Sequence, residues 1–153
     1  MGYTHYFSHS KTSKKKWEAI LADCKTLKEK LPKDIKIAGY DGTGDPIFND
    51  MEITFNGDAN LDLDHETFYL SKAGIKQRGY EKKEGRKGFA FCKTAKKPYD
   101  LLVCACLLVY KHHSPNTMEL GSDGLDEDWG YAENFVKETL GYTVQVKDMW
   151  EEL

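Results

Sequence analysis

A run of ten residues without a charged side chain, 101–110, constrains the fold of this chain more than any other feature. Ten residues are too few to cross a bilayer, which takes about 20. Pro98 suits the first turn of a helix because its missing N–H has no partner there, and Asp100 favours the same positive end. The sequence therefore predicts a helix at residues 98–111 that is apolar on every side and lies at the centre of the fold.

Two further helices are predicted around this one. Apolar residues recur at helical spacing over residues 13–31, with Thr12 or Ser13 available as a cap and Pro32 as the stop. A similar helical spacing of apolar residues includes Trp129 and Leu140. Asp123 or Asp126 can cap this predicted helix, and Gly141 ends it.

In the other segments, polar and apolar residues alternate, which is typical of strands, or turn-forming residues are frequent, which is typical of loops. Strands are predicted at residues 2–8, 35–38, 51–56, 66–70, 89–92, 118–120 and 142–146. The first carries aromatic residues on both faces, so it is expected to be covered on both sides. Residues 74–88 are charged and lack apolar periodicity, which predicts a mobile loop. The chain is therefore expected to be one α+β domain, 1–153, with a mixed or mainly antiparallel sheet and about three helices on one face.

Composition restricts the cellular setting. The first residues lack the basic start and apolar core of an export signal, which predicts a cytoplasmic protein without a membrane segment. The four cysteines, Cys24, Cys92, Cys104 and Cys106, form no CxxC pair and are expected to be reduced thiols.

Charge is distributed unevenly along the chain. Residues 76–97 hold nine basic and two acidic side chains, whereas residues 117–153 hold ten acidic and two basic ones. This asymmetry suits an anionic ligand or head-to-tail self-association into a homo-oligomer, and it is equally compatible with two solvated faces.

Three segments carry a resemblance to a family. The opening MGYTHYF, the stretch FCKTAKKPYDLLVC at residues 91–104, and SDG at 122–124 followed by Trp129 resemble a family of small bacteriophage proteins of unsettled function. Members commonly have Trp where Phe7 stands. The resemblance implies a virus-encoded protein of the host cytoplasm, and it transfers no catalytic residue.

A phosphate-binding site is expected where the basic segment meets the central helix. Lys93, Thr94, Lys96 and Lys97 come just before Pro98, where unpaired backbone N–H groups and the helix dipole favour an anion. The expected ligand contacts also include side chains that stack a base or read its polar edge. These are Tyr3, His5, Tyr6 and Tyr99 for stacking, and His65, Glu66 and Asp100 for the edge. The alternative is that the lysines form a solvated connector and the tyrosines belong to the core.

Catalytic and metal sites have weaker signals. His65 and Thr67 fit the H-x-[ST]-x element of two-histidine phosphoesterases, whose second copy would be His112-His113-Ser114-Pro115, in a context unsuited to a strand. Suitable metal ligands are present in His5, His9, His65, Glu66, His112 and His113 and in nearby aspartates, but their spacing is uninformative; no cofactor is expected. Cys92 lies near lysines that would lower its pKa, but the sequence identifies no partner histidine, and a buried cysteine is the simpler interpretation.

Three functions remain open from the sequence. The leading hypothesis is a binding protein that counters host defence by sequestering a nucleotide-type signal. The second is an enzyme that cleaves a phosphodiester with His65 and Thr67, and the third is an inhibitor that binds a host protein through a charged face.

Overall fold

A computed structural model describes residues 3–85 and 88–147. Its first sheet has the strand order β6-β1-β7, formed by Phe89–Lys93, Thr4–His9 and Met118–Ser122, with both pairings antiparallel. In this register Tyr6 lies opposite Phe91 on one side and Gly121 on the other. The chain's first strand is therefore the central strand of this sheet.

A second antiparallel sheet is formed by the segment between the first two long helices. Strand β4 (Glu52–Gly57) pairs with β2 (Ile37–Ala38), β3 (Ile47–Phe48) and β5 (Phe68–Ser71). The sequence predicted a single mixed or mainly antiparallel sheet; the antiparallel pairing is confirmed, whereas the strands form two sheets rather than one. Strand β3 was not predicted, because two residues are too few to show a period.

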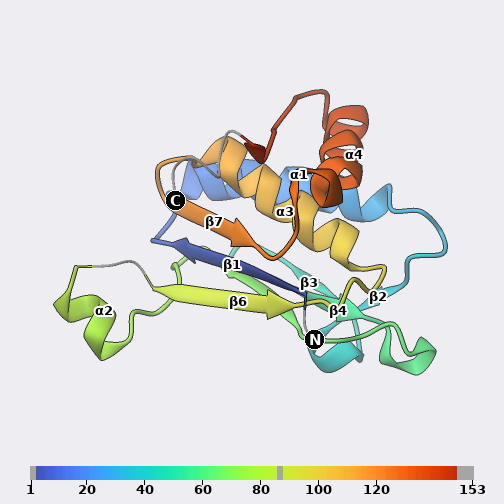
Figure 1. The fold of residues 1–153 in the computed structure, drawn as a ribbon, viewed down its shortest axis with the longest axis horizontal. Coiled ribbons are helices and arrows are strands. Elements are labelled where there is room, and N and C mark those ends of the chain that lie inside the picture. The colour runs from blue at the N-terminus through green and yellow to red at the C-terminus, as the bar shows by residue number, and fades with distance from the viewer. Residues whose placement is uncertain (1–2, 86–87, 148–153) are drawn as a thin grey trace.

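Three long helices cover the sheets, as Figure 1 shows: α1 (Lys14–Glu29), α3 (Asp100–His113) and α4 (Gly130–Leu140). Helix α3 packs against both α1 and α4. The predicted α+β class is thereby confirmed, with helices on one side of antiparallel sheets.

The central position of α3 is also confirmed. The side chains of residues 102–111 are all buried, and Leu102 to Tyr110 join one apolar core with Trp17 and Ile20 of α1 and Val136 of α4. Helix α1 begins as predicted, because the Ser13 side chain accepts a hydrogen bond from the backbone N–H of Lys16.

Shorter helical elements occupy the connections. Three are 3-10 turns: η1 (Tyr40–Gly42), η2 (Ala59–Leu61) and η3 (Asp126–Trp129). The fourth is α2 (Gly79–Lys83), within the segment predicted to be a mobile loop. Its Glu81 is buried, and the Glu81 carboxylate accepts a hydrogen bond from the Arg78 backbone N–H at 3.0 Å. The expectation of a loop throughout residues 74–88 is therefore wrong at this helical turn; Arg86 and Lys87 lie outside the described residues.

The prediction of a last strand at residues 142–146 is wrong. Gly141 ends α4 in the left-handed conformation (φ 85°), and the chain then runs without a strand partner. Val144 and Val146 are nevertheless part of the core, and the Val146 N–H donates to the Glu133 carboxylate at 2.8 Å. The apolar residues alternate here because one side of the segment is buried. An irregular segment can be buried on one side just as a strand can.

Strand β1 is covered on its inner face and only in part on its outer face, where Thr4 is buried but Tyr6 is not, which corrects the expectation of two covered faces. His5, Phe7 and His9 point toward the helices and are buried, whereas Tyr6 is 36% exposed on the outer face. The four cysteines are free and buried, in agreement with the expected reduced thiols. Within residues 3–85 and 88–147, no helix combines the length and the apolar character that a membrane span requires.

Candidate functional site

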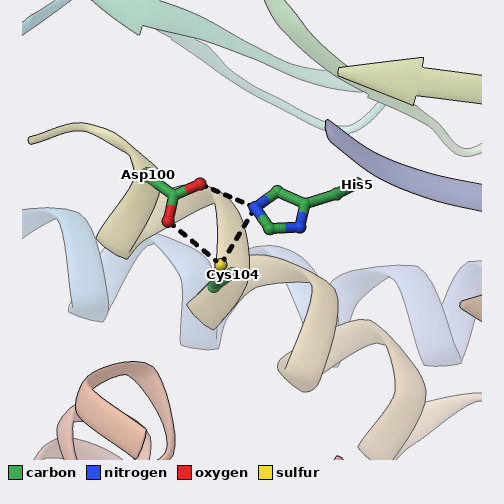
Figure 2. Close-up of side chains that lie close together, drawn as sticks. All are labelled: His5, Asp100 and Cys104. Carbon is green, nitrogen blue, oxygen red and sulfur yellow. Dashed lines mark hydrogen bonds and ion pairs between the residues drawn. The ribbon is translucent and has the colours of Figure 1, made fainter. Parts of the chain in front are cut away.

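A buried polar cluster joins β1 to the start of α3. The inward alternation of β1 directs His5 toward α3, whose first residue is Asp100, and Cys104 lies one helical turn further on the same face. Figure 2 shows the three side chains converging. His5 and Cys104 are almost completely buried, and the Asp100 side chain is 18% exposed.

The three functional groups lie within direct contact of one another. His5 Nε2 is 2.6 Å from Asp100 Oδ1. Cys104 Sγ is 3.4 Å from His5 Nε2 and 3.5 Å from Asp100 Oδ2. An imidazole nitrogen, a carboxylate and a thiol are thus brought to one point inside the protein.

Neighbouring hydroxyl groups hold this cluster in place. Thr94 Oγ1 donates to Asp100 Oδ1 at 2.6 Å, and Ser122 Oγ lies 2.8 Å from His5 Nδ1. The Gly124 backbone N–H donates to the same Ser122 oxygen at 2.9 Å. Both nitrogens of the His5 ring therefore have partners, which fixes the orientation of the ring.

Burial keeps the Cys104 thiol and the Tyr3 hydroxyl, both close to His5, protonated at pH 7. Burial, followed by the nearby Asp100 charge, raises the pKa of the Cys104 thiol well above 9.0. The same two causes, in the same order, raise the pKa of the Tyr3 hydroxyl. Cys104 is therefore a neutral thiol at pH 7 in the free protein and is not an activated nucleophile.

The cluster opens to solvent through a pocket of about 260 Å³. Asp100 and Cys104 form part of its wall, and the rest is lined by the charged residues Lys96, Lys97 and Asp128, by the apolar residues Pro98, Leu101 and Ala132, and by Tyr131. Ala95 and Lys96 both have positive φ values, 53° and 57°. Two consecutive non-glycine residues in this conformation are energetically costly, and such strain is concentrated at functional sites.

The two lysines of the pocket already have partners within the protein. Lys96 Nζ is 3.8 Å from Asp128 Oδ1 and 4.8 Å from the centre of the Tyr3 ring. Lys97 Nζ donates to the Asp62 carbonyl at 2.9 Å. The Lys96 pair is exposed and long, so the ammonium group can move to a ligand at little cost.

The backbone at the start of α3 differs from the arrangement expected of a helix N-terminus that binds an anion. The N–H groups of Asp100, Leu101 and Leu102 donate to the carbonyls of Lys97, Pro98 and Tyr99, at 2.9, 3.3 and 3.0 Å. The Asp100 carboxylate also lies at this helix end. Any anion held at this junction therefore depends on the lysine side chains rather than on these N–H groups.

The structure separates the residues that the sequence suggested for the site. Tyr3, His5, Thr94 and Asp100 lie together in the buried cluster, with Lys97 at the edge of the pocket. Lys93 is exposed on the outer sheet face, with Nζ 5.7 Å from the Phe91 ring centre.

Glu66 and Tyr99 form a structural link beside this cluster. The buried Tyr99 hydroxyl donates to the Glu66 carbonyl at 2.6 Å. The Glu66 carboxylate accepts from the Lys93 backbone N–H at 2.8 Å. Tyr6 points outward, and its hydroxyl donates to Asp123 Oδ1 at 3.2 Å.

The two H-x-[ST]-x segments lie near opposite ends of α3. The exposed His65 adjoins Glu66, which contacts Tyr99 before the helix begins, whereas His112 and His113 lie in the last turn. A helix of 14 residues is about 21 Å long, so the two segments do not face each other across one site. Thr67 Oγ1 accepts hydrogen bonds from the Asp41 N–H at 3.0 Å and the Asn56 side chain at 3.1 Å, which is a structural role.

Cys92 is not in the electropositive setting that its neighbouring lysines suggested. It points into the core, where burial, followed by the Glu66 charge, raises the pKa of its thiol to about 12. The interpretation of Cys92 as a buried core cysteine is confirmed.

Cys104 and Ser122 were missed as site residues. The spacing of Asp100 and Cys104 could have indicated a shared helix face, because residues four apart are neighbours on a helix. Ser122 had no such signal, because it reaches His5 only through the pairing of β1 with β7.

Comparison with known proteins adds no relative: neither a family model, nor a curated protein, nor a solved structure matches this chain.

Proposed function

We propose that the protein is a binding protein for a small phosphate-bearing ligand, held in the pocket beside the start of α3. The observation that carries this proposal is the presence of Lys96 and Lys97 in the wall of one pocket. Ammonium groups bind phosphate through charge-assisted hydrogen bonds. The strained backbone at Ala95 and Lys96 supports a functional role for this loop.

The shape and composition of the pocket favour a nucleotide among such ligands. Tyr131 lies at its rim and is 81% exposed, so its ring is free to stack on a base. A larger pocket of about 380 Å³ beside Ser122 is lined by Asp126 and Glu127, whose charges repel phosphate. The lysine-lined pocket is therefore the better phosphate site of the two.

The resemblance to small phage proteins gives this binding a biological role. A phage protein that holds a nucleotide tightly without turning it over would remove a host immune signal. Sequestration of a nucleotide-type defence signal in the host cytoplasm is accordingly the function that we propose.

Titration calorimetry with nucleoside monophosphates and cyclic dinucleotides tests the proposal. Replacing both Lys96 and Lys97 with Ala should weaken binding more than tenfold, because each phosphate hydrogen bond from a charged group contributes about 1.5 to 3 kcal/mol. The binding constant should also fall as salt rises.

A matched variant controls for net charge. Lys15→Ala with Lys16→Ala removes the same charge from the exposed face of α1 and should leave the affinity unchanged. If no phosphate-bearing compound gives heat with the folded parent protein, the binding proposal is wrong. If the nucleotide is recovered cleaved, the protein is an enzyme.

Inhibition of a host protein is a second candidate, favoured by the outer face of the first sheet. Phe91 is 46% exposed there beside Tyr6, whose ring stacks on Phe89 at 6.1 Å. Aromatic side chains are enriched at protein interfaces. A complex with a host protein that is lost on Phe91→Asp but retained by the Lys96 and Lys97 variant would establish this function instead.

A further inference from the structure

We propose that His5, Asp100 and Cys104 bind a divalent transition metal ion, with zinc as the ion that best fits the three ligands. Their donor atoms come from two elements, β1 and α3, and meet at one buried point (Figure 2). Imidazole, thiolate and carboxylate are the side chains that hold zinc in proteins. This inference goes beyond the proposed ligand binding and does not depend on it.

The two separations that involve the Cys104 sulfur fit tetrahedral zinc. Bond lengths of about 2.3 Å to sulfur and 2.0 to 2.2 Å to nitrogen or oxygen place sulfur about 3.6 Å from each of the other ligand atoms. Cys104 Sγ is 3.4 Å from His5 Nε2 and 3.5 Å from Asp100 Oδ2. The shorter contact of 2.6 Å involves Asp100 Oδ1, so Oδ2 is the oxygen assigned to the metal.

The hydrogen bonds around the cluster are those that a metal site requires. A metal on His5 Nε2 leaves the proton on Nδ1, which then donates to Ser122 Oγ, 2.8 Å away. Thr94 donates to Asp100 Oδ1 and so leaves Oδ2 available. Cys104 loses its S–H proton to solvent as its sulfur binds the ion, so the thiol releases one proton per ion.

Three protein ligands leave a fourth position on the ion. Asp100 and Cys104 both border the 260 Å³ pocket, so this position is accessible to water or to a ligand group. Zinc sites with three protein ligands and one open position are typical of catalytic or ligand-binding centres, whereas purely structural sites have four protein ligands.

Calorimetry with zinc chloride alone, on protein without a histidine tag, tests the site. We expect one ion per chain with a Kd of about 1 μM or tighter, and a rise in melting temperature with zinc. Cobalt chloride should give the visible bands of a tetrahedral ion and the near-ultraviolet absorption of a cobalt–thiolate bond. The cobalt spectrum of the parent protein decides the outcome even if a variant fails to fold.

Substitutions separate the ligands from their surroundings. Cys104→Ser and Asp100→Asn should each weaken zinc binding at least 100-fold, and Cys104→Ser should abolish the thiolate absorption. Ser122→Ala should cost about 10- to 100-fold, as the loss of a hydrogen bond to a metal-binding histidine does. Cys106→Ala is the matched control, because Cys106 is a buried cysteine of the same helix that contacts Cys24 instead, and it should bind zinc like the parent.

Three results would overturn the inference: no zinc binding at 100-fold the expected Kd, cobalt binding without thiolate absorption, or equal zinc affinity in Cys104→Ser and Cys106→Ala. The double Ala variant at Lys96 and Lys97 should retain zinc. Loss of nucleotide binding and loss of metal binding are thereby measured independently.

Discussion

At the scale of single residues, His9 has an unusual buried setting. It is fully buried on the inner face of β1, with the Tyr110 hydroxyl 3.1 Å from Nδ1. Its Nε2 has no hydrogen-bond partner among the described residues. Burial lowers the pKa of His9 from 6.5 to about 4, with the Ser10 carbonyl opposing the change.

This shift predicts a loss of stability in mild acid. Because the unfolded chain binds a proton at His9 below pH 6.5 and the folded protein does not until about pH 4, the free energy of unfolding falls across that range. The His9 contribution is on the order of 3 kcal/mol. Urea unfolding at pH 7 to 4.5 should show a steeper decline for the parent than for His9→Gln, in which carboxyl titration is unchanged. Parallel curves for the two proteins would show that His9 does not titrate in this way.

At the scale of elements, the sequence predicted the helices better than their surroundings. Residues 101–110 could only form a buried helix, and the pattern of α1 with its Ser13 cap is local information. Residues 142–146 were misassigned because a strand requires a partner, which the sequence pattern does not identify. The same pattern could not grade burial along α1, where Leu21 follows the helical spacing of the apolar residues but is only partly buried.

This difference predicts unequal costs for two leucine truncations. Leu107→Ala, at a fully buried position of α3, should lower the free energy of unfolding by about 2 to 5 kcal/mol. Leu21→Ala should cost clearly less, because part of its side chain is already in contact with water. Chemical denaturation of both variants measures the two values; equal losses would mean that the packing of α1 on α3 differs from that described.

At the scale of the whole molecule, the candidate site is made by contacts that are distant in sequence. His5 is 95 residues from Asp100 and 99 from Cys104. The sequence singled out His5 and Asp100 for other reasons, but it could not bring Cys104 to them, because that requires the placement of β1 against α3. Single residues of a site were thus predictable from chemistry, whereas their assembly depended on the tertiary fold.

The whole molecule should also be unevenly stable, with α3 and α2 at the two extremes. Helix α3 is enclosed by other elements, so its amides should exchange with solvent only when the protein unfolds globally. Helix α2 has five residues and stands away from the helical layer in Figure 1, and a single turn of helix is unstable without packing. Hydrogen exchange followed by mass spectrometry should therefore find residues 79–83 exchanging orders of magnitude faster than residues 102–111. The buried Glu81 opposes this expectation, and Glu81→Ala should accelerate exchange in α2 without affecting α3. Protection of α2 equal to that of α3 would show that the segment unfolds only with the core.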